Sequence, residues 1–256
     1  MKFHVLTLFP EMFQGMMQTS IVKRALGEEK ASIQLVQFRD FTQDPYCRVD
    51  TPPIGGGAGL VLKFQPIADA LKSISQPGRK ILLTPRGKTF KQADAVRLSK
   101  EASITLICGH YEGFDERIYT EVDESISLGD FVMTGGEIAA MAVLDAIIRL
   151  LPGVIEAESL NEESFTHGLL EYPQYTEPRA LDNQVVPDIL YSGNHEAIRK
   201  WRLKESLRLT KLHRPDLFQQ LVLTNEMKSL IQELEEHRIG DWETTAIEKG
   251  RKFTKR

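Results

Sequence analysis

Short runs of β-branched and aliphatic residues alternate with longer helical patterns over the first two thirds of the chain. The short runs predict strands over Phe3–Leu8, Ile33–Phe38, Lys80–Thr84, Ile104–Cys108 and Ser125–Leu128. The longer patterns predict helices over Glu11–Leu26, Gln65–Ser75, Lys91–Glu101 and Glu137–Leu151. Strands separated by helices pair in parallel, so this order predicts an α/β domain with a mostly parallel sheet and helices on both faces.

The ends of the fourth predicted helix carry their own signals. Thr134 and Glu137 have the spacing of a capping box, in which two side chains satisfy backbone N–H groups at a helix start. Pro152 and Gly153 follow the helical pattern and predict its end.

The last third of the chain has a different character. Residues 156–163 hold four acids and no cation, which predicts a hinge or an exposed connector. From Ser192 on the pattern is helical, and Arg199–Arg214 contains seven cations against one acid. We therefore expect an α/β domain over residues 1–155, a linker over 156–173 and a small, mainly helical domain over 174–256.

Charge and cysteine content exclude several classes of protein. The net charge of −4 over 256 residues excludes a uniformly basic coat, so any nucleic-acid contact must come from a local patch. Two cysteines are too few for a disulfide framework, and the scattered histidines predict no metal site held by the protein alone. Asp145 and Arg149 interrupt the most apolar stretch, so we expect a cytoplasmic protein with no membrane segment.

Three glycine-bearing loops lie after or near predicted strands, around residues 55–59, 109–113 and 129–136. In open α/β sheets such loops gather beyond the carboxyl ends of the strands, where ligands bind, although any one glycine pair can simply form a turn. None has the spacing of a phosphate-binding P-loop or a dinucleotide-binding loop. The absence of both spacings argues against a nucleotide triphosphatase and against a nicotinamide enzyme.

A series of motifs occurs in a fixed order. It comprises LTLFPEMF at residues 6–13, RDFT at 39–42, Asp50 before the glycines of 55–59, CGHYEGFDER at 108–117, GDFVMTGGE at 129–137 and LYSGNH at 190–195, with Ile198, Trp201 and Arg202 after them. From Phe3 to about Pro215, this series resembles the bacterial tRNA (guanine-N1)-methyltransferases, which act on the guanosine at tRNA position 37.

The resemblance implies a fold and partners. It implies a SPOUT-type domain with a deep trefoil knot, although knots are rare. It also implies a homodimer with its sites at the subunit interface, S-adenosylmethionine as methyl donor, Mg²⁺ for activity and the anticodon stem-loop of tRNA as the partner.

The resemblance also implies three cofactor-binding segments. Leu83, Leu128 and Met133 would wall an adenine, although plain core packing is the alternative for each. The implied cofactor-binding residues are Leu83, Thr84, Pro85, Gly109, Tyr111, Glu112, Ser127, Leu128, Gly129, Asp130, Phe131, Val132, Met133, Gly135 and Gly136.

Two catalytic residues follow from the same resemblance. Glu163 stands where the family has an aspartate that removes the N1 proton of guanine; the alternative is a solvated acid in a linker. Arg149 matches an arginine that would stabilise charge on the guanine O6, or else it complements the end of a helix.

RNA contacts are implied in both parts of the chain. Asp50, Gly55, Gly57 and Gly59 match the loop that receives the flipped-out base. The helix that follows Ser192 would meet the phosphates of the anticodon stem through Arg199, Lys200, Arg202, Lys204 and Arg208, or would be a solvated charged face. The implied RNA-binding residues of this part are Ser192, Asn194, His195, Arg199, Trp201 and Arg202.

Two other functions remain open. One is an RNA-binding relative with weakened catalysis, which the glutamate at position 163 favours. The other is a SPOUT methyltransferase that acts on another RNA position.

Overall fold

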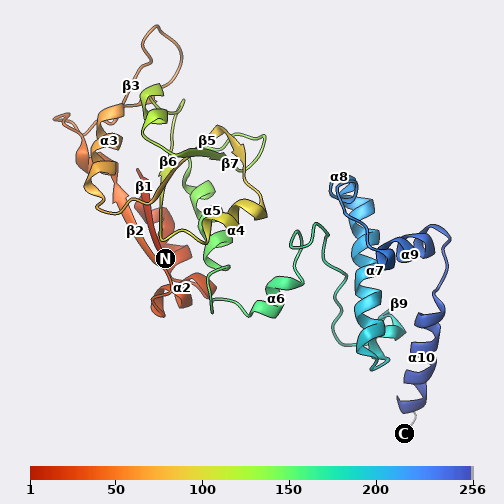
Figure 1. Ribbon diagram of the computed structural model, residues 1–256. Coiled ribbons are helices and arrows are strands. Elements are labelled where there is room, and N and C mark those ends of the chain that lie inside the picture. The colour runs from red at the N-terminus through yellow and green to blue at the C-terminus, as the bar shows by residue number, and fades with distance from the viewer. Residues whose placement is uncertain (255–256) are drawn as a thin grey trace. The chain divides into compact units, whose positions relative to one another are not determined.

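The computed structural model describes residues 1–254 and divides the chain into two compact units (Figure 1). The first unit runs from Met1 to Ala157 and the second begins at Glu158. Each unit has its own core, so each is described by itself.

A parallel sheet forms the centre of the first unit. In the described residues it contains β1 (Lys2–Thr7), β2 (Ser32–Gln37), β5 (Arg79–Thr89), β6 (Ser103–Cys108) and β7 (Glu124–Ser127). The spatial order is β2-β1-β6-β5-β7, and every neighbouring pair is parallel. The predicted mostly parallel sheet is confirmed.

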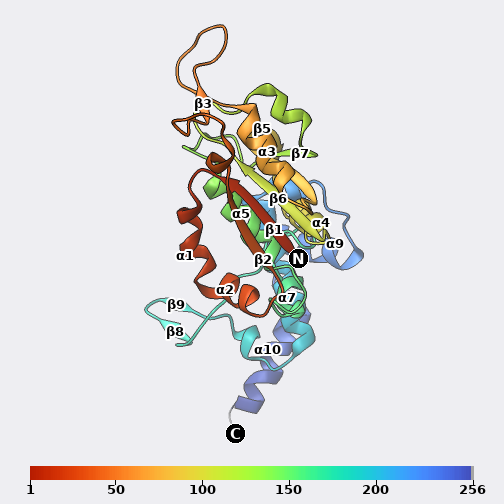
Figure 2. The ribbon, with the colours of Figure 1, turned by 90° about the vertical axis from the view of Figure 1, so that its left-hand side faces the viewer.

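Helices cover both faces of this sheet, and side chains alternate between the two layers. Phe3 and Val5 of β1 pack with α2 (Ser20–Gly27), α4 (Gln92–Leu98) and α5 (Glu137–Ile148). Leu6 packs on the opposite face with α3 (Phe64–Ser73) and with the 3₁₀ helices η2 (Phe38–Phe41) and η3 (Glu116–Thr120). Figure 2 shows α2 and α3 on opposite sides of the sheet. The predicted flanking helices are therefore confirmed.

Two predicted elements differ from the structure. The first helix is broken into η1 (Pro10–Phe13), α1 (Gln14–Met17) and α2; the break before α2 lies at Gln18 and Thr19, next to Ser20, whose φ is +52°. β5 is longer than predicted because it continues past Pro85, where its register against β7 shifts. Proline has no N–H to donate to a sheet, which explains an irregularity at that point.

The predicted capping box of α5 is wrong. The N-cap residue is Gly136, which makes no side-chain cap, and Thr134 stays outside the helix. Glu137 instead directs its carboxylate to Thr7 and His110. The helix also ends at Ile148, ahead of the predicted proline–glycine signal, with Arg149 as its C-cap residue.

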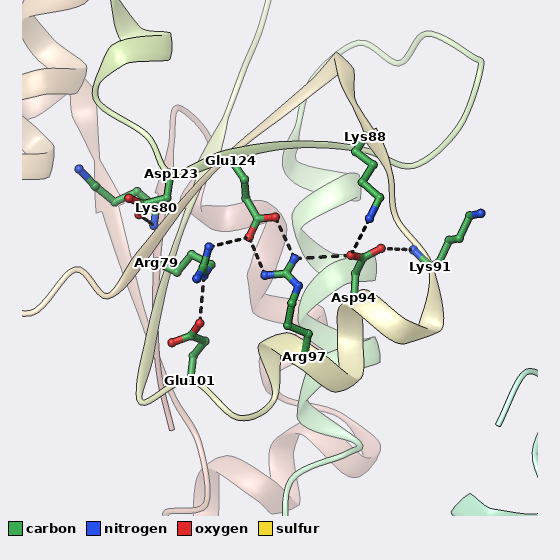
Figure 3. Close-up of polar contacts among 9 residues, drawn as sticks. All are labelled: Arg79, Lys80, Lys88, Lys91, Asp94, Arg97, Glu101, Asp123 and Glu124. Carbon is green, nitrogen blue, oxygen red and sulfur yellow. Dashed lines mark hydrogen bonds and ion pairs between the residues drawn. The ribbon is translucent and has the colours of Figure 1, made fainter. Parts of the chain in front are cut away.

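A chain of ion pairs ties α4 to the starts of β5 and β7 (Figure 3). Arg97 of α4 binds Glu124 of β7 at 2.8 Å and lies 3.5 Å from Asp94. Arg79 of β5 lies 2.9 Å from Glu101 and 3.6 Å from Glu124. Glu124 is thus shared by two arginines, so it links the strand pair to the helix that covers it.

The second unit is built around α7 (His195–His213). The other elements are α6 (Ala157–Asn161), the short strands β8 (Ala180–Leu181) and β9 (Gln184–Val185), η4 (Asp188–Tyr191), α8 (Pro215–Phe218), α9 (Asn225–Glu235) and α10 (Asp241–Thr254). Trp201 packs with Ile189 and Ala246, whereas Leu207 packs with Leu169 and Leu230. The predicted connector over residues 156–163 thus contains a short helix, α6.

Among the described residues, no helix is both long enough and apolar enough to cross a membrane.

Candidate active site

A cavity of about 320 Å³ opens where β5, β6 and β7 end. Three segments line it: residues 109–114 follow β6, residues 126–136 begin at the end of β7, and residues 83–86 lie within β5, where its pairing with β6 ends. This edge of a parallel sheet is the usual place for a ligand. The lining includes every residue predicted to bind the cofactor except Asp130. The structure therefore brings together residues that are up to 53 positions apart, from Leu83 to Gly136.

Apolar side chains and the backbone of glycine residues make up much of the cavity wall. Leu83 and Ile126 are buried, and Leu128 and Met133 are partly buried against the core. At Gly136 a β-carbon would lie 2.8 Å from the Cα of Cys108, so only glycine fits there. Such a wall suits a flat, partly apolar ring that is recognised through backbone groups.

Backbone hydrogen bonds fix two of the three lining segments to one another. The Gly136 N–H donates to the Gly109 carbonyl at 2.8 Å, and His110 forms an isolated antiparallel bridge with Gly135. Just after β5, the Phe90 N–H donates to the carbonyl of Ser127, a lining residue, at 2.8 Å. The cavity is therefore bounded by hydrogen-bonded backbone.

Arg86 and Tyr119 line the cavity, and the sequence analysis missed both. The Arg86 guanidinium binds the Glu116 carboxylate with two hydrogen bonds, of 2.7 and 3.0 Å. It also lies over the Tyr119 ring, 4.3 Å from the centroid. The hydrogen bonds to Glu116 raise the pKa of Arg86, so an arginine–glutamate ion pair stands at the cavity. Glu116 lies three residues after the GHYEG motif, and this was the one sequence signal that an ion pair stands at the cavity.

A small antiparallel hairpin brings the predicted base-receiving loop beside the cavity. Its strands are β3 (Asp50–Thr51) and β4 (Val61–Leu62). The Glu112 N–H donates to the Leu60 carbonyl at 3.0 Å, and the Leu62 N–H donates to the Gly113 carbonyl at 2.9 Å. The glycines of residues 55–59 therefore lie in a loop that is anchored on a cavity segment.

Asp50 and Tyr111 join the two predicted sites. Burial raises the pKa of the Tyr111 hydroxyl, and the negative charge of Asp50, with a hydrogen bond to it, raises that pKa further. Tyr111 has a φ of +59°, an unusual value for a residue with a side chain, and its side chain is 49% exposed. The phenol hydroxyl donates the hydrogen bond to the Asp50 carboxylate, which links the predicted base-receiving loop to a cavity residue.

The two predicted catalytic residues lie in different units. Arg149 is the C-cap residue of α5 in the first unit and is half-buried. Glu163 follows α6 in the second unit and is also half-buried. The cavity lining includes neither residue.

The start of α7 holds three predicted RNA-binding residues. Asn194 caps the helix by accepting a hydrogen bond from the Ala197 N–H at 3.2 Å, and the Ser192 hydroxyl accepts one from the Asn194 N–H at 3.2 Å. His195 is exposed at the first position of the helix. These contacts give the segment a defined conformation.

The predicted basic face of α7 is largely neutralised by acids of α7 itself and of other segments. Arg199 binds both Glu196 and Glu226, at 2.7 and 2.6 Å. Arg202 lies 3.5 Å from Glu162. A local count of charges along the sequence could not show this, because Glu162 and Glu226 lie outside α7.

Two residues predicted for the RNA-facing side of α7 are buried. Lys204 is 7% exposed, and its Nζ lies 3.0 Å from the Glu233 carboxylate, so the expectation that it meets phosphates is wrong. Trp201 is 6% exposed and packs in the core of the second unit. Its contribution to RNA binding would be to hold α7 in place.

No cluster of three or more potential metal ligands (His, Cys, Asp or Glu) occurs among the residues that the structure describes.

Comparison with known proteins identifies the family. Residues 1–220 match the sequence profile of the tRNA (guanine-1)-methyltransferases, TrmD. The chain belongs to this family. A tRNA (guanine-N(1)-)-methyltransferase of Lactobacillus helveticus is 52% identical over 235 residues, which is 91% of this chain and 98% of the relative. One from Clostridium novyi is also 52% identical over 235 residues, covering 91% of this chain and 97% of the relative.

These comparisons confirm the family that the ordered motifs predicted, and they confirm that the chain is a tRNA methyltransferase acting on guanine N1. The cavity lies within the matched residues, because its lining runs from Leu83 to Ala139.

Proposed function

We propose that this protein transfers a methyl group from S-adenosylmethionine to N1 of the guanosine at position 37 of tRNA. The observation that carries the proposal is the cavity at the ends of β5, β6 and β7, which gathers the family's cofactor motifs at one place. The base-receiving loop is anchored on the edge of that cavity.

The cavity suits S-adenosylmethionine, which supplies an electrophilic methyl group on a sulfonium. Leu83, Leu128 and Met133 would hold the adenine between apolar surfaces, and the glycines of residues 129–136 let backbone groups approach it. Asp130 does not line the cavity, so we assign it to holding the loop in shape rather than to direct contact.

Glu163 is the general base of the proposal. Guanine N1 carries a proton that must leave as the nitrogen attacks the methyl group, and a carboxylate can accept it. Arg149 stabilises the negative charge that develops on the guanine O6 as the proton leaves. Half-burial supports these roles, because a charge that is partly removed from water acts more strongly on a nearby group.

The tRNA is bound by both units. In the first unit, Asp50, Gly55, Gly57 and Gly59 receive the guanine after it leaves its stack. In the second unit, Arg199 and Arg202 bind backbone phosphates of the anticodon stem in exchange for their carboxylate partners, while Ser192, Asn194 and His195 bind near the start of α7.

We propose the predicted domain organisation with roles attached. Residues 1–155 bind the cofactor, residues 156–173 are the linker and residues 174–256 bind tRNA. The knot of the SPOUT fold belongs to the first domain, and the family membership and the parallel sheet order support it.

The active form is a homodimer with its sites at the subunit interface. Phe131, Val132 and Ile138 support this, because these large apolar side chains are 55%, 86% and 51% exposed and lie close together in sequence at and beside the cavity. A second subunit would cover them. Mg²⁺ takes part through ligands supplied largely by the substrates. The protein acts in the cytoplasm, where its tRNA substrate is found.

The experiment that tests this function is transfer of labelled methyl from S-adenosylmethionine to two tRNA transcripts that differ only in guanosine or adenosine at position 37. We expect transfer to the guanosine transcript alone. Transfer to both would mean a methyltransferase of another position. Transfer to neither, with cofactor and tRNA bound, would mean an RNA-binding relative that has lost catalysis.

A further inference from the structure

Glu137 is a buried carboxylate that the proposed reaction does not use. Its side chain is 1% exposed, and its Oε1 accepts a hydrogen bond from the Thr7 hydroxyl at 2.7 Å. Its Oε2 lies 2.9 Å from Nε2 of His110. The Thr7 oxygen in turn accepts a hydrogen bond from the Phe9 N–H at 2.9 Å. The chain of contacts thus runs from the end of β1 through the start of α5 to a residue that lines the cavity.

The directions of these hydrogen bonds follow from the donors available. A carboxylate only accepts, and Thr7 uses its single hydroxyl proton on it. His110 therefore carries its hydrogen on Nε2 and donates it to Glu137. The first turn of α5 favours a carboxylate at this position, because the helix N-terminus presents N–H groups and a partial positive charge.

The imidazole of His110 has little room to turn. A β-carbon at Gly135 would lie 2.2 Å from its Nε2 and 2.6 Å from Oε2 of Glu137. The Phe9 ring meets the imidazole edge to face, with 4.8 Å between centroids. The backbone of His110 pairs with Gly135 as well, so this one residue joins two lining segments of the cavity.

We propose that Glu137 is a positioning residue for cofactor binding. Through His110 it holds the segment Gly109–Gly113 in the conformation that lines the cavity. The inference rests on the proposed function, since it takes this cavity to be the S-adenosylmethionine site. A buried carboxylate costs free energy that an apolar side chain of similar size avoids, so its presence here calls for a role beyond filling space.

The first test is Glu137→Gln, which keeps the shape and removes the charge. We expect the Kd for S-adenosylmethionine, measured by calorimetry on the full-length protein, to rise about tenfold or more, a free-energy change of about 1.4 kcal/mol. Thr7→Val removes the hydroxyl that supports Glu137 and should also raise this Kd. Thr7→Ser keeps the hydroxyl and should leave the Kd close to that of the parent.

Thr105→Val is the matched control. Thr105 is a buried hydroxyl on β6 that donates to the Pro77 carbonyl at 2.6 Å, and it is not part of the cavity lining. We expect this variant to lower the melting temperature without changing the Kd for S-adenosylmethionine. The comparison separates a positioning role from a purely structural one.

Nitrogen NMR of the histidine rings gives a second readout. The parent should show His110 with its hydrogen fixed on Nε2, and Glu137→Gln should lose this single tautomer. A folded Glu137→Gln or Thr7→Val variant that binds S-adenosylmethionine within twofold of the parent would overturn the inference. A parent that does not bind S-adenosylmethionine at all would instead overturn the proposed function, and the inference with it.

Discussion

Gly59 lies against the side chain of Glu112, so closely that a β-carbon on the glycine would be 2.2 Å from the Glu112 carboxylate. Gly59 belongs to the predicted base-receiving loop and Glu112 to a cofactor segment. The backbone at Gly59 also has a φ of +78°, which favours glycine. The contact places the two predicted sites next to each other.

Replacing Gly59 with alanine should impair methyl transfer. The substitution strains the backbone by about 1 kcal/mol and displaces Glu112. We expect kcat/KM for tRNA to fall at least about tenfold, with a smaller change in the Kd for S-adenosylmethionine. Gly56→Ala is the control, since Gly56 has a φ of +87° but no atom within 4 Å of the added carbon. Equal losses in both variants would show that the backbone strain alone matters.

Glu163→Gln should lower turnover strongly. The amide keeps the shape of the side chain but cannot accept the N1 proton, and general-base catalysis contributes about 10²–10⁴-fold. Single-turnover methyl transfer measures the chemical step, and the Kd for S-adenosylmethionine should stay near that of the parent. Glu156→Gln changes another acid of the same stretch and should be active. Turnover of Glu163→Gln within a few-fold of the parent would assign the base to another group.

Arg199→Ala combined with Arg202→Ala should weaken tRNA binding in a salt-dependent way. Each lost phosphate contact removes about 0.7 to 0.9 from the slope of log K against log salt concentration. Titration of tRNA at several salt concentrations measures this slope. Arg214→Ala removes a cation of the same unit that pairs with Asp216 and should change the slope less. A loss of affinity that does not depend on salt would indicate misfolding instead.

The sequence predicted the sheet well and the charges of α7 poorly. β6 is buried along its whole length and carries a run of apolar residues from Leu106 to Cys108, a local pattern that is easy to recognise. Whether Arg199 is available depends on Glu226, which comes from α9 and lies 27 positions away. Pairing of this kind depends on how helices pack, and no local pattern encodes it.

The cavity, too, could be predicted from the sequence only in part. Its loops could be predicted because their motifs occur in a fixed order along the chain. The role of Glu137 could not be predicted from its neighbours, since the capping-box spacing with Thr134 suggested a local partner. Its partners, Thr7 and His110, lie 130 and 27 positions away. The parallel sheet brings the ends of β1 and β6 together, and only the fold reveals this contact.

The buried charges of the second unit give a prediction about stability. Lys204 is paired with Glu233 at 3.0 Å and lies 3.5 Å from Glu243. Glu233→Gln should destabilise the unit by about 2 kcal/mol, because the buried lysine loses its nearest carboxylate and keeps the Arg238 carbonyl at 3.3 Å and the more distant Glu243. Urea unfolding followed by circular dichroism measures this difference.

Glu243→Gln should behave differently from Glu233→Gln. Burial raises the pKa of Glu243, so ionising this group costs the folded state free energy once the pH exceeds the usual carboxyl range. We expect the variant to be at least as stable as the parent at neutral pH. The difference should vanish as the pH falls and the parent carboxyl becomes protonated. A large loss of stability at neutral pH would contradict this.

The two cysteines should react very differently. Burial raises the pKa of the Cys108 thiol, and the Glu137 carboxylate adds to the effect, so little thiolate forms there. Cys47 is exposed. We expect iodoacetamide to label Cys47 alone in the folded protein, and both cysteines after unfolding, as read by mass spectrometry. Rapid labelling of Cys108 in the folded protein would show that the end of β6 opens to solvent.

Mapping the transferred methyl group on the tRNA is the most direct test of the proposed reaction. The protein, S-adenosylmethionine and Mg²⁺ are incubated with a tRNA transcript that has guanosine at position 37, and the digested product is analysed by mass spectrometry. We expect 1-methylguanosine at position 37 and no other methylated nucleotide. Methylation at a different nucleotide, or none despite bound cofactor and tRNA, would contradict it.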